Sequence, residues 1–179
     1  MIIVIMGVSG SGKSTIGRAL AETLHWGFSD ADDFHSPANV EKMKNGIALT
    51  DEDREPWLRS MKAAIEKWKR DESGHVLACS ALKASYREIL GQNDPDVKFV
   101  YLQGGFDLLC QRLKQRKGHF FNPALLRSQF EALEPPKGAL VVDVSKEPQE
   151  IVGAILGAIK SGDHGRPNQS REGETPGEP

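Results

Sequence analysis

A glycine-rich segment near the start of the chain has the residue types and spacing that bind a chain of phosphates. Residues 7–14 read Gly-Val-Ser-Gly-Ser-Gly-Lys-Ser, which fits G-x-x-x-x-G-K-[ST] at every defined position. The glycines let successive backbone amides point inward, so that these amides and the positive end of a following helix hold phosphate oxygens. Lys13 is expected to reach the β- and γ-phosphates, and the Ser14 hydroxyl to ligate Mg²⁺. The segment therefore predicts a nucleotide site.

Two aspartates and a histidine follow the second expected strand. Asp30 and Asp32 are two residues apart, so on an extended strand end their side chains point the same way. Ligands of an open parallel sheet lie beyond the carboxyl ends of its strands. One carboxylate can order Mg²⁺ or its waters, and the other can accept the proton of an attacking hydroxyl. The alternatives are a solvated acidic turn for the aspartates and a packing or capping residue for His35.

Further polar side chains fall where an acceptor could lie. Arg54 precedes Pro56, Ser80 ends the third expected strand, and Lys83 and Arg87 are four residues apart on the helix expected to follow. Arginine pairs with a carboxylate through two hydrogen bonds, while lysine and serine suit hydroxyls or phosphate. The alternative for Lys83 and Arg87 is an ordinary solvated helix face.

A basic stretch begins at Arg112 and includes Arg116 and Lys117. Such a stretch can close over ATP as a lid, where its arginines stabilise charge on the transferring phosphoryl group and exclude water. We expect this lid at about residues 112–122. The alternative is a solvated helix end whose cations suit the helix dipole.

Apolar runs of strand length alternate with helical patterns along the chain. The expected strands cover residues 2–6, 26–29, 75–80, 97–103 and 139–144, and the expected helices cover residues 13–24, 37–45, 56–70, 82–90, 106–117, 122–133 and 147–160. Thr50 and Asp53 have the spacing of a capping box, but Pro56 argues against a helix that starts at Thr50, because proline lacks the donor that an interior position needs. The alternation predicts an α/β fold in which a parallel sheet is covered on both faces.

Composition and charge narrow the function further. The chain of 179 residues has 23 Lys and Arg against 25 Asp and Glu. Residues 161–179 hold four acids and two bases, so residues 1–160 are formally neutral. This balance predicts that the protein is no general nucleic-acid binder. Two cysteines and the lack of a membrane-length apolar run predict a cytoplasmic protein without a membrane partner. We expect one domain over residues 1–160 and a disordered tail over residues 161–179, which are rich in glycine and proline.

The chain resembles the bacterial gluconate kinases, small P-loop kinases related to shikimate and nucleoside monophosphate kinases. The resemblance covers roughly residues 3–160. Its first motif, residues 6–14, is shared by many kinases. The more specific motifs are Asp30-x-Asp32-x-x-His35, Asn39-x-Glu41-Lys42-Met43, Asp51-x-Asp53-Arg54-x-Pro56-Trp57-Leu58, Cys79-Ser80-Ala81-Leu82-Lys83-x-x-Tyr86-Arg87 and Arg116-Lys117-Gly118-His119-Phe120-Phe121. The chain departs from the family pattern at Ala48 and Gly91, neither of which replaces a catalytic group.

The resemblance implies ATP-dependent phosphorylation of D-gluconate at its 6-hydroxyl, with Mg²⁺, in a homodimer. It implies a three-layer sandwich with a five-stranded parallel sheet in the order 2-3-1-4-5 and a helical lid. The implied catalytic residues are Lys13, Asp32 and Arg116. The implied ATP-binding residues are Gly7, Val8, Ser9, Gly10, Ser11, Gly12, Lys13, Ser14, Thr15, Arg112 and Arg116. Substrate binding is assigned to Asp32, His35, Arg54, Ser80, Lys83, Arg87 and His119, and metal binding to Ser14 and Asp30, either directly or through water.

Two alternatives stay open on the sequence. One is a kinase for another small hydroxy acid, such as shikimate, and the other is a nucleotide-binding switch that turns over no metabolite. The lysine, the paired aspartates and the basic stretch favour phosphoryl transfer, because a switch has no need for Asp32 together with carboxylate-binding cations.

Overall fold

A five-stranded sheet forms the centre of the protein, and a computed structural model describes it over residues 1–116 and 122–161. The strands are β1 (Ile2–Met6), β2 (Gly27–Asp30), β3 (His75–Ala78), β4 (Val97–Gln103) and β5 (Leu140–Asp143). Every neighbouring pair is parallel, and the order is β2-β3-β1-β4-β5. The predicted α/β fold and strand order are therefore confirmed.

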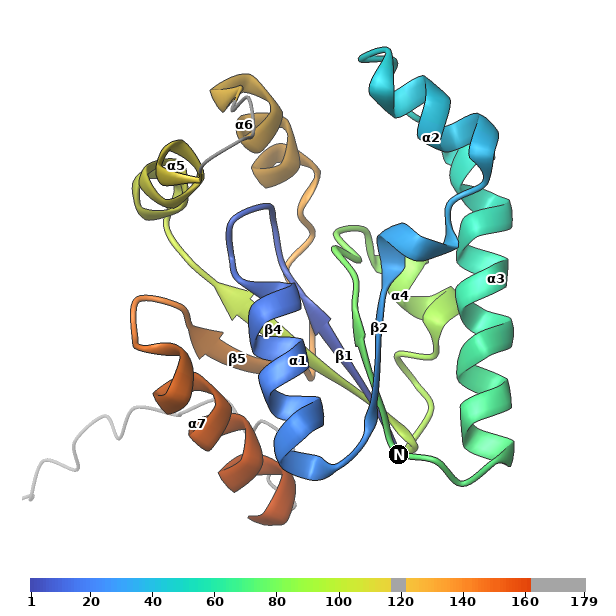
Figure 1. Ribbon diagram of the computed structural model, residues 1–179, viewed down its shortest axis with the longest axis vertical. Coiled ribbons are helices and arrows are strands. Elements are labelled where there is room, and N and C mark those ends of the chain that lie inside the picture. Colours follow the sequence, from blue (N-terminus) through green and yellow to red (C-terminus); the bar gives the residue numbers. More distant parts are fainter. Residues whose placement is uncertain (117–121, 162–179) are drawn as a thin grey trace, which may run out of the picture.

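Helices cover both faces of this sheet, and further helices stand above the carboxyl ends of its strands (Figure 1). They are α1 (Lys13–Leu24), α2 (Pro37–Lys44), α3 (Asp51–Arg70), α4 (Ala84–Leu90), α5 (Phe106–Gln115), α6 (Pro123–Ala132) and α7 (Pro148–Ser161), with a 3-10 helix over Ala31–Phe34. α1 and α7 lie on one face and α3 and α4 on the other, while α2, α5 and α6 stand above the carboxyl ends of the strands. This arrangement leaves those strand ends open to a ligand.

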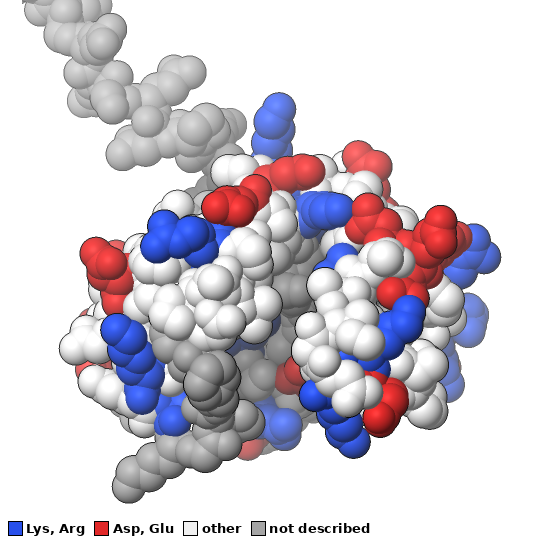
Figure 2. All heavy atoms as spheres, turned by 90° about the horizontal axis from the view of Figure 1, so that it is seen from above, with Lys and Arg blue, Asp and Glu red and all other residues white. Residues whose placement is uncertain are grey.

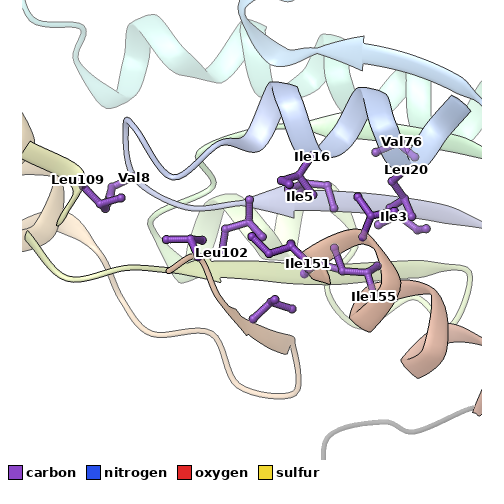
Figure 3. Packing of buried hydrophobic residues seen from close by; sticks show 14 of the residues in the cluster. Ile3, Ile5, Val8, Ile16, Leu20, Val76, Leu102, Leu109, Ile151 and Ile155 are labelled. Carbon is purple, nitrogen blue, oxygen red and sulfur yellow. The ribbon is translucent and has the colours of Figure 1, made fainter. Parts of the chain in front are cut away.

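Alternating side chains of the strands divide the core into two clusters. In β1, Ile3 and Ile5 pack with Ile16 and Leu20 of α1 and with Ile155 of α7 (Figure 3). The residues between them, Ile2, Val4 and Met6, face α3 and pack with Trp57, Leu58, Met61 and Ile65. All five residues of β1 are fully buried because both faces of the sheet are covered.

The third helix corrects the expectation that a helix would begin only at Pro56. α3 begins at Asp51, with Thr50 as its N-cap, and Pro56 lies inside it. The capping box is complete: Asp53 N–H donates to Thr50 Oγ1 over 3.1 Å, and Thr50 N–H donates to Asp53 Oδ2 over 3.0 Å. Pro56 removes one backbone hydrogen bond, but only in the second turn of a helix that Trp57 and the residues after it anchor in the core.

Replacing Thr50 with alanine is expected to destabilise the protein by about 1 kcal/mol, because the amide of Asp53 loses its cap. Chemical denaturation of the variant measures this as a lower midpoint with an unchanged slope. The matched control is Thr23→Ala, an exposed threonine near the end of α1. Equal midpoints for the wild type and Thr50→Ala would show that this cap does not stabilise α3.

Two predictions fall partly or wholly outside the described residues. The expected lid at 112–122 includes residues 117–121, and the expected tail consists almost entirely of residues 162–179. Among the helices over residues 1–116 and 122–161, none combines the length and apolar character needed to cross a bilayer.

Candidate active site

The phosphate loop, residues 7–14, connects β1 to α1 and has the backbone that its glycines require. Gly7 has φ +150°, and a Cβ on it would lie 2.7 Å from Ser11 Oγ and 2.9 Å from the Leu102 carbonyl oxygen. Gly12 adopts φ +91° as the N-cap residue of α1. Both conformations are rare for other residues. Glycine at these two positions therefore allows the backbone amides of the loop to point toward a common centre.

Two polar groups of this loop, one buried and one half-buried, fit a phosphate ligand. Ser11 is 1% exposed, and its Oγ has no hydrogen-bond partner among the described residues. Lys13 Nζ donates to the carbonyl of Val8 over 3.1 Å. Burial lowers the pKa of Lys13, and the nearby carboxylates of Asp32 and Asp30 act in the opposite direction. A bound phosphate chain would supply the negative charge that this buried ammonium lacks.

Ser14 and Asp30 lie together at the start of α1 and the end of β2. Ser14 Oγ donates to Asp30 Oδ2 over 2.6 Å, while Asp30 Oδ1 accepts from the backbone of Asp32 over 3.0 Å. Oxygen ligands of this kind suit Mg²⁺, which takes one or two protein ligands and completes its shell with phosphate oxygens and water. Over residues 1–116 and 122–161, no three acidic, histidine or cysteine side chains cluster closely enough to hold a metal ion by themselves.

Asp32 faces the same centre from the 3-10 helix. Partial desolvation of its carboxyl group raises its pKa, and the neighbouring charge of Asp30 adds to this rise. His35 and Lys13 act in the opposite direction. The residue itself stays accessible to solvent, so a hydroxyl group can approach it. A carboxylate in this environment is a stronger proton acceptor than an ordinary aspartate.

A cavity of about 250 Å³ joins these groups at the carboxyl ends of the strands. Its lining residues are Ser9, Gly10, Gly12, Lys13, Ser14, Thr15, Asp30, Ala31, Asp32, Trp57, Ala78, Cys79, Ser80, Arg116 and Gln129. Figure 2 shows the molecule from above, on the side of the carboxyl ends of the strands. This face is hollowed, and basic and acidic side chains are interspersed on it. A larger cavity of about 660 Å³ lies near the amino-terminal ends of β1 and β4, away from Lys13 and Asp32. The chemistry therefore points to the smaller cavity.

The imidazole of His35 stacks on the indole of Trp57, with 4.6 Å between ring centroids and 6° between their planes. Trp57 is held in turn by its Nε1–H, which donates to the Ala31 carbonyl over 2.7 Å. His35 Nδ1 is buried without a hydrogen-bond partner in the described part of the chain. Burial lowers the pKa of His35, with Asp32 opposing and Arg54 reinforcing this change. A mainly neutral imidazole next to Asp32 can hydrogen-bond an acceptor hydroxyl.

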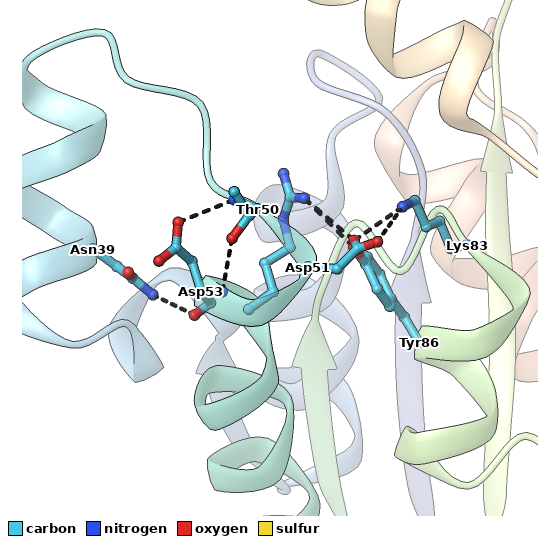
Figure 4. Close-up of polar contacts among 7 residues, drawn as sticks. Asn39, Thr50, Asp51, Asp53, Lys83 and Tyr86 are labelled. Carbon is cyan, nitrogen blue, oxygen red and sulfur yellow. Dashed lines mark hydrogen bonds and ion pairs between the residues drawn. The ribbon is translucent and has the colours of Figure 1, made fainter.

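Lys83 and Tyr86 belong to a cluster centred on Asp51 (Figure 4), and Arg54 lies near the same carboxylate. Lys83 Nζ donates to the two carboxylate oxygens of Asp51 over 2.9 and 3.1 Å, and the Tyr86 hydroxyl donates to Asp51 as well. Arg54 Nη1 lies 3.9 Å from Asp51 Oδ1 and 3.5 Å from the Tyr86 hydroxyl. Hydrogen bonds from Tyr86 and Lys83 lower the pKa of Asp51. The cluster joins α3 to α4.

Arg87 lies apart from the cavity. It is 2% exposed, its Nη1 donates to the carbonyls of Ala81 and Leu82 over 3.0 Å each, and its Nε donates to the side chain of Gln92 over 3.0 Å. α4 begins at Ala84 with Lys83 as its N-cap residue, so Lys83 and Arg87 do not share the helix face that a start at Leu82 would give them. The contacts of Arg87 hold the loop before α4, whereas Ser80 of that loop lines the cavity.

The basic stretch is placed only in part. Arg116 lines the cavity, and Arg112 donates to the carbonyl of Val144 beyond β5. His119 lies outside the described residues. Cys79 borders the cavity as a buried thiol whose pKa is raised by burial to about 12, which is typical of a packing residue and not of a nucleophile.

Sequence reasoning missed several groups at this site. Gln129 of α6 contacts the phosphate loop, where its Oε1 accepts from Ser9 N–H over 2.7 Å and its Nε2 donates to Ser9 Oγ over 2.9 Å. The two residues are 120 positions apart, and a glutamine on an amphipathic helix gives no signal of its own. Asp51 and Tyr86 stood in the family motifs, but their types alone did not separate them from surface residues.

Comparison with known proteins places this geometry in a family. The shikimate kinase family model matches residues 9–156. A probable gluconokinase of Dictyostelium discoideum is 48% identical over 173 residues, which cover 89% of this chain and 86% of that protein. The thermoresistant gluconokinase of Escherichia coli K12 is 42% identical over 165 residues, which cover 90% of this chain and 94% of that enzyme.

A solved structure agrees with these relatives. The crystal structure of a gluconokinase from Sinorhizobium meliloti 1021 superposes with a TM-score of 0.78 at 44% identity, covering 89% of this chain and 91% of that one. The fold, the phosphate loop and the relatives that match most of the chain at over 40% identity all indicate the same family. The chain therefore belongs to the gluconokinase family, within the wider group that the shikimate kinase model describes.

Proposed function

We propose that this protein transfers the γ-phosphoryl group of ATP to the 6-hydroxyl of D-gluconate, giving 6-phosphogluconate and ADP. The observation that carries the proposal is the cavity itself, because the phosphate loop, the Ser14–Asp30 pair and Asp32 all line it. The gluconokinase relatives support gluconate as the acceptor. A nucleotide switch is disfavoured, since it would not place a carboxylate of raised pKa beside the lysine of the phosphate loop.

The residues of the chain divide the work of transfer among them. The amides of the phosphate loop and Lys13 bind and orient the phosphates, and Lys13 stabilises the charge that develops during transfer. Ser14 and Asp30 would hold Mg²⁺, which supplies charge neutralisation on the phosphate oxygens when it is bound. Asp32 accepts the proton of the attacking hydroxyl, while Arg116 borders the cavity as a second cation for the phosphates.

Recognition of the acceptor is assigned to Ser80, which lines the cavity, and to His35, Arg54 and Lys83, which lie outside its lining. His35 and Ser80 suit the hydroxyls of a polyol chain. The cations Arg54 and Lys83 share one carboxylate, Asp51, so the three together carry a single net positive charge. That charge matches an acceptor with one carboxylate, which is the charge of gluconate. Arg87 is left out of this set because its donors are bound to the protein interior.

The test is an ADP-release assay of the full chain with Mg-ATP and a panel of acceptors. Gluconate, shikimate, other sugar acids and nucleoside monophosphates form the panel. We expect strong turnover with gluconate and little with the others, and phosphorus NMR of the product locates the phosphate on the 6-oxygen. Turnover with a different acceptor would keep phosphoryl transfer and reassign Arg54, Ser80 and Lys83. ADP release independent of any acceptor would contradict the proposal.

Replacing Arg116 with alanine is expected to lower kcat at least about tenfold while the KM for gluconate changes less. The reason is that a cation at the phosphate end of the cavity acts on the transferring group more than on the bound acceptor. Steady-state kinetics with both substrates varied separate the two effects. A raised KM for gluconate with kcat unchanged would place Arg116 at the acceptor instead.

Three broader properties complete the proposal. We assign residues 1–160 to one kinase domain, with the segment 112–122 as its lid. The family resemblance supports a homodimer as the working form. The composition, with two buried free cysteines, supports a cytoplasmic enzyme.

A further inference from the structure

The segment from Gln129 to Glu134 contacts two loops of the active site at once. At one end, Gln129 is bonded to both polar groups of Ser9 in the phosphate loop: it accepts from the amide over 2.7 Å and donates to the hydroxyl over 2.9 Å. Both contacts are partly buried, and Gln129 lines the cavity. The side chain is thus bound to the loop expected to hold the nucleotide.

At its other end, the segment holds the loop between β3 and α4, residues 79–83. The backbone N–H of Glu134 donates to the Leu82 carbonyl over 2.9 Å, and Glu134 Oε2 accepts from the amide of Ala84 over 2.7 Å. Arg87 of α4 also binds this loop, because its Nη1 donates to the carbonyls of Ala81 and Leu82. This loop carries Ser80 and Lys83, two of the groups assigned to the acceptor.

The β3–α4 loop needs such support because of its backbone. Ala81 has φ +44° and is 1% exposed, so a residue with a Cβ is held in the left-handed region inside the protein. This conformation costs about 1–3 kcal/mol and persists only where neighbouring contacts impose it. Arg87 and Glu134 supply two such contacts, at the carbonyl of Ala81 and at the amide of Ala84.

Leu133 makes the segment rigid between its two ends. It is partly buried and packs against both core clusters, one on each side of the sheet. A shift of Gln129 therefore cannot be absorbed by a loose linker before it reaches Glu134.

We propose that Gln129 and Glu134 are positioning residues that couple the nucleotide site to the acceptor site, so that bound nucleotide raises the affinity for gluconate. Nucleotide orders the phosphate loop, Gln129 follows Ser9, and Glu134 then holds the β3–α4 loop in its binding conformation. The entropic cost of ordering the β3–α4 loop is then offset by nucleotide binding, so less of the binding free energy of the acceptor is lost. The inference rests on the proposed function, because gluconate is its probe.

The experiment measures gluconate binding to the full chain by calorimetry, without nucleotide and with a saturating, non-hydrolysable Mg-ATP analogue. In the wild type we expect the analogue to lower the Kd of gluconate at least about fivefold, the lower end of typical coupling between sites. In Gln129→Ala and in Glu134→Ala we expect this ratio to fall below about twofold. Glu134→Gln should restore it, because an amide oxygen can still accept from Ala84.

The matched control is Glu131→Ala, which removes an exposed glutamate from the same helix and should keep the wild-type ratio. Thermal unfolding of each variant shows whether it is folded, and a general loss of packing would not be reversed by Glu134→Gln. Coupling that persists in both alanine variants would overturn the inference and assign it to the backbone bond from Gly7 to Ser80. A wild type that does not bind gluconate in either condition would overturn the proposed function as well.

Discussion

Replacing Lys13 with alanine is expected to lower kcat by at least about a thousandfold, the largest effect of any single change that we predict. Lys13 is the cation of the phosphate loop and lines the cavity together with Asp30 and Asp32. Removing a charge that stabilises a transferring phosphoryl group costs about 10³–10⁵ in rate when an arginine supplies it, and this lysine is placed to do the same. The acceptor-dependent release of ADP measures the loss.

The matched control for this change is Lys67→Ala, which removes an exposed lysine of α3 that pairs with Asp71 at the surface. It should keep wild-type turnover. Thermal unfolding tests the alternative that Lys13→Ala only unfolds the chain. Because burial lowers the pKa of Lys13, its removal relieves a desolvated charge, and the variant should be at least as stable as the wild type. Full activity of Lys13→Ala would contradict the assignment of the phosphate loop.

Replacing Asp32 with asparagine is expected to lower turnover by at least about a hundredfold while ATP still binds. Losing a general base costs about 10²–10⁴ in rate, and asparagine keeps the size of the side chain but cannot accept the proton. Binding of a fluorescent ATP analogue checks that the nucleotide site is intact. The neighbouring Asp33→Asn is the matched control, since Asp33 is an exposed aspartate in the same 3-10 helix. Near-normal turnover of Asp32→Asn would remove Asp32 from the role of base.

The pH dependence of the wild type tests the same residue independently. Desolvation and the charge of Asp30 raise the pKa of Asp32, and the base works only when it is deprotonated. Activity should therefore fall as the pH decreases through this raised pKa, at a higher pH than an ordinary aspartate, with a pKa of about 3.9, would give. A profile of kcat/KM against pH shows this as the acidic limb for the free enzyme.

The sequence predicted the parts of the site that depend on a continuous motif. The phosphate loop is one such part, because its glycines, Lys13 and Ser14 act through their spacing along a strand–loop–helix unit. The strand order 2-3-1-4-5 was predicted as well, but from the resemblance to a family of known fold and not from the residue pattern. The roles of Lys13, Asp30 and Asp32 stay predictions, although the structure brings all three to one cavity.

Other parts depend on contacts that a linear pattern does not contain. Pro56 suggested a later helix start because proline lacks the backbone donor of an interior helix position. In the folded protein the capping box and the burial of Trp57 outweigh that one missing hydrogen bond. Arg87 was assigned to the acceptor from a shared face with Lys83, and that face disappears when the helix begins two residues later. Gln129 could not be found because its partner, Ser9, is distant in the chain.

The buried thiol behind the phosphate loop has a consequence for how the enzyme withstands oxidants. Burial raises the pKa of the Cys79 thiol to about 12, so the thiolate is scarce at neutral pH. Peroxide and electrophiles attack the thiolate, so this sulfur is almost inert although it borders the cavity. We therefore expect mild peroxide to leave Cys79 unmodified and the cavity intact.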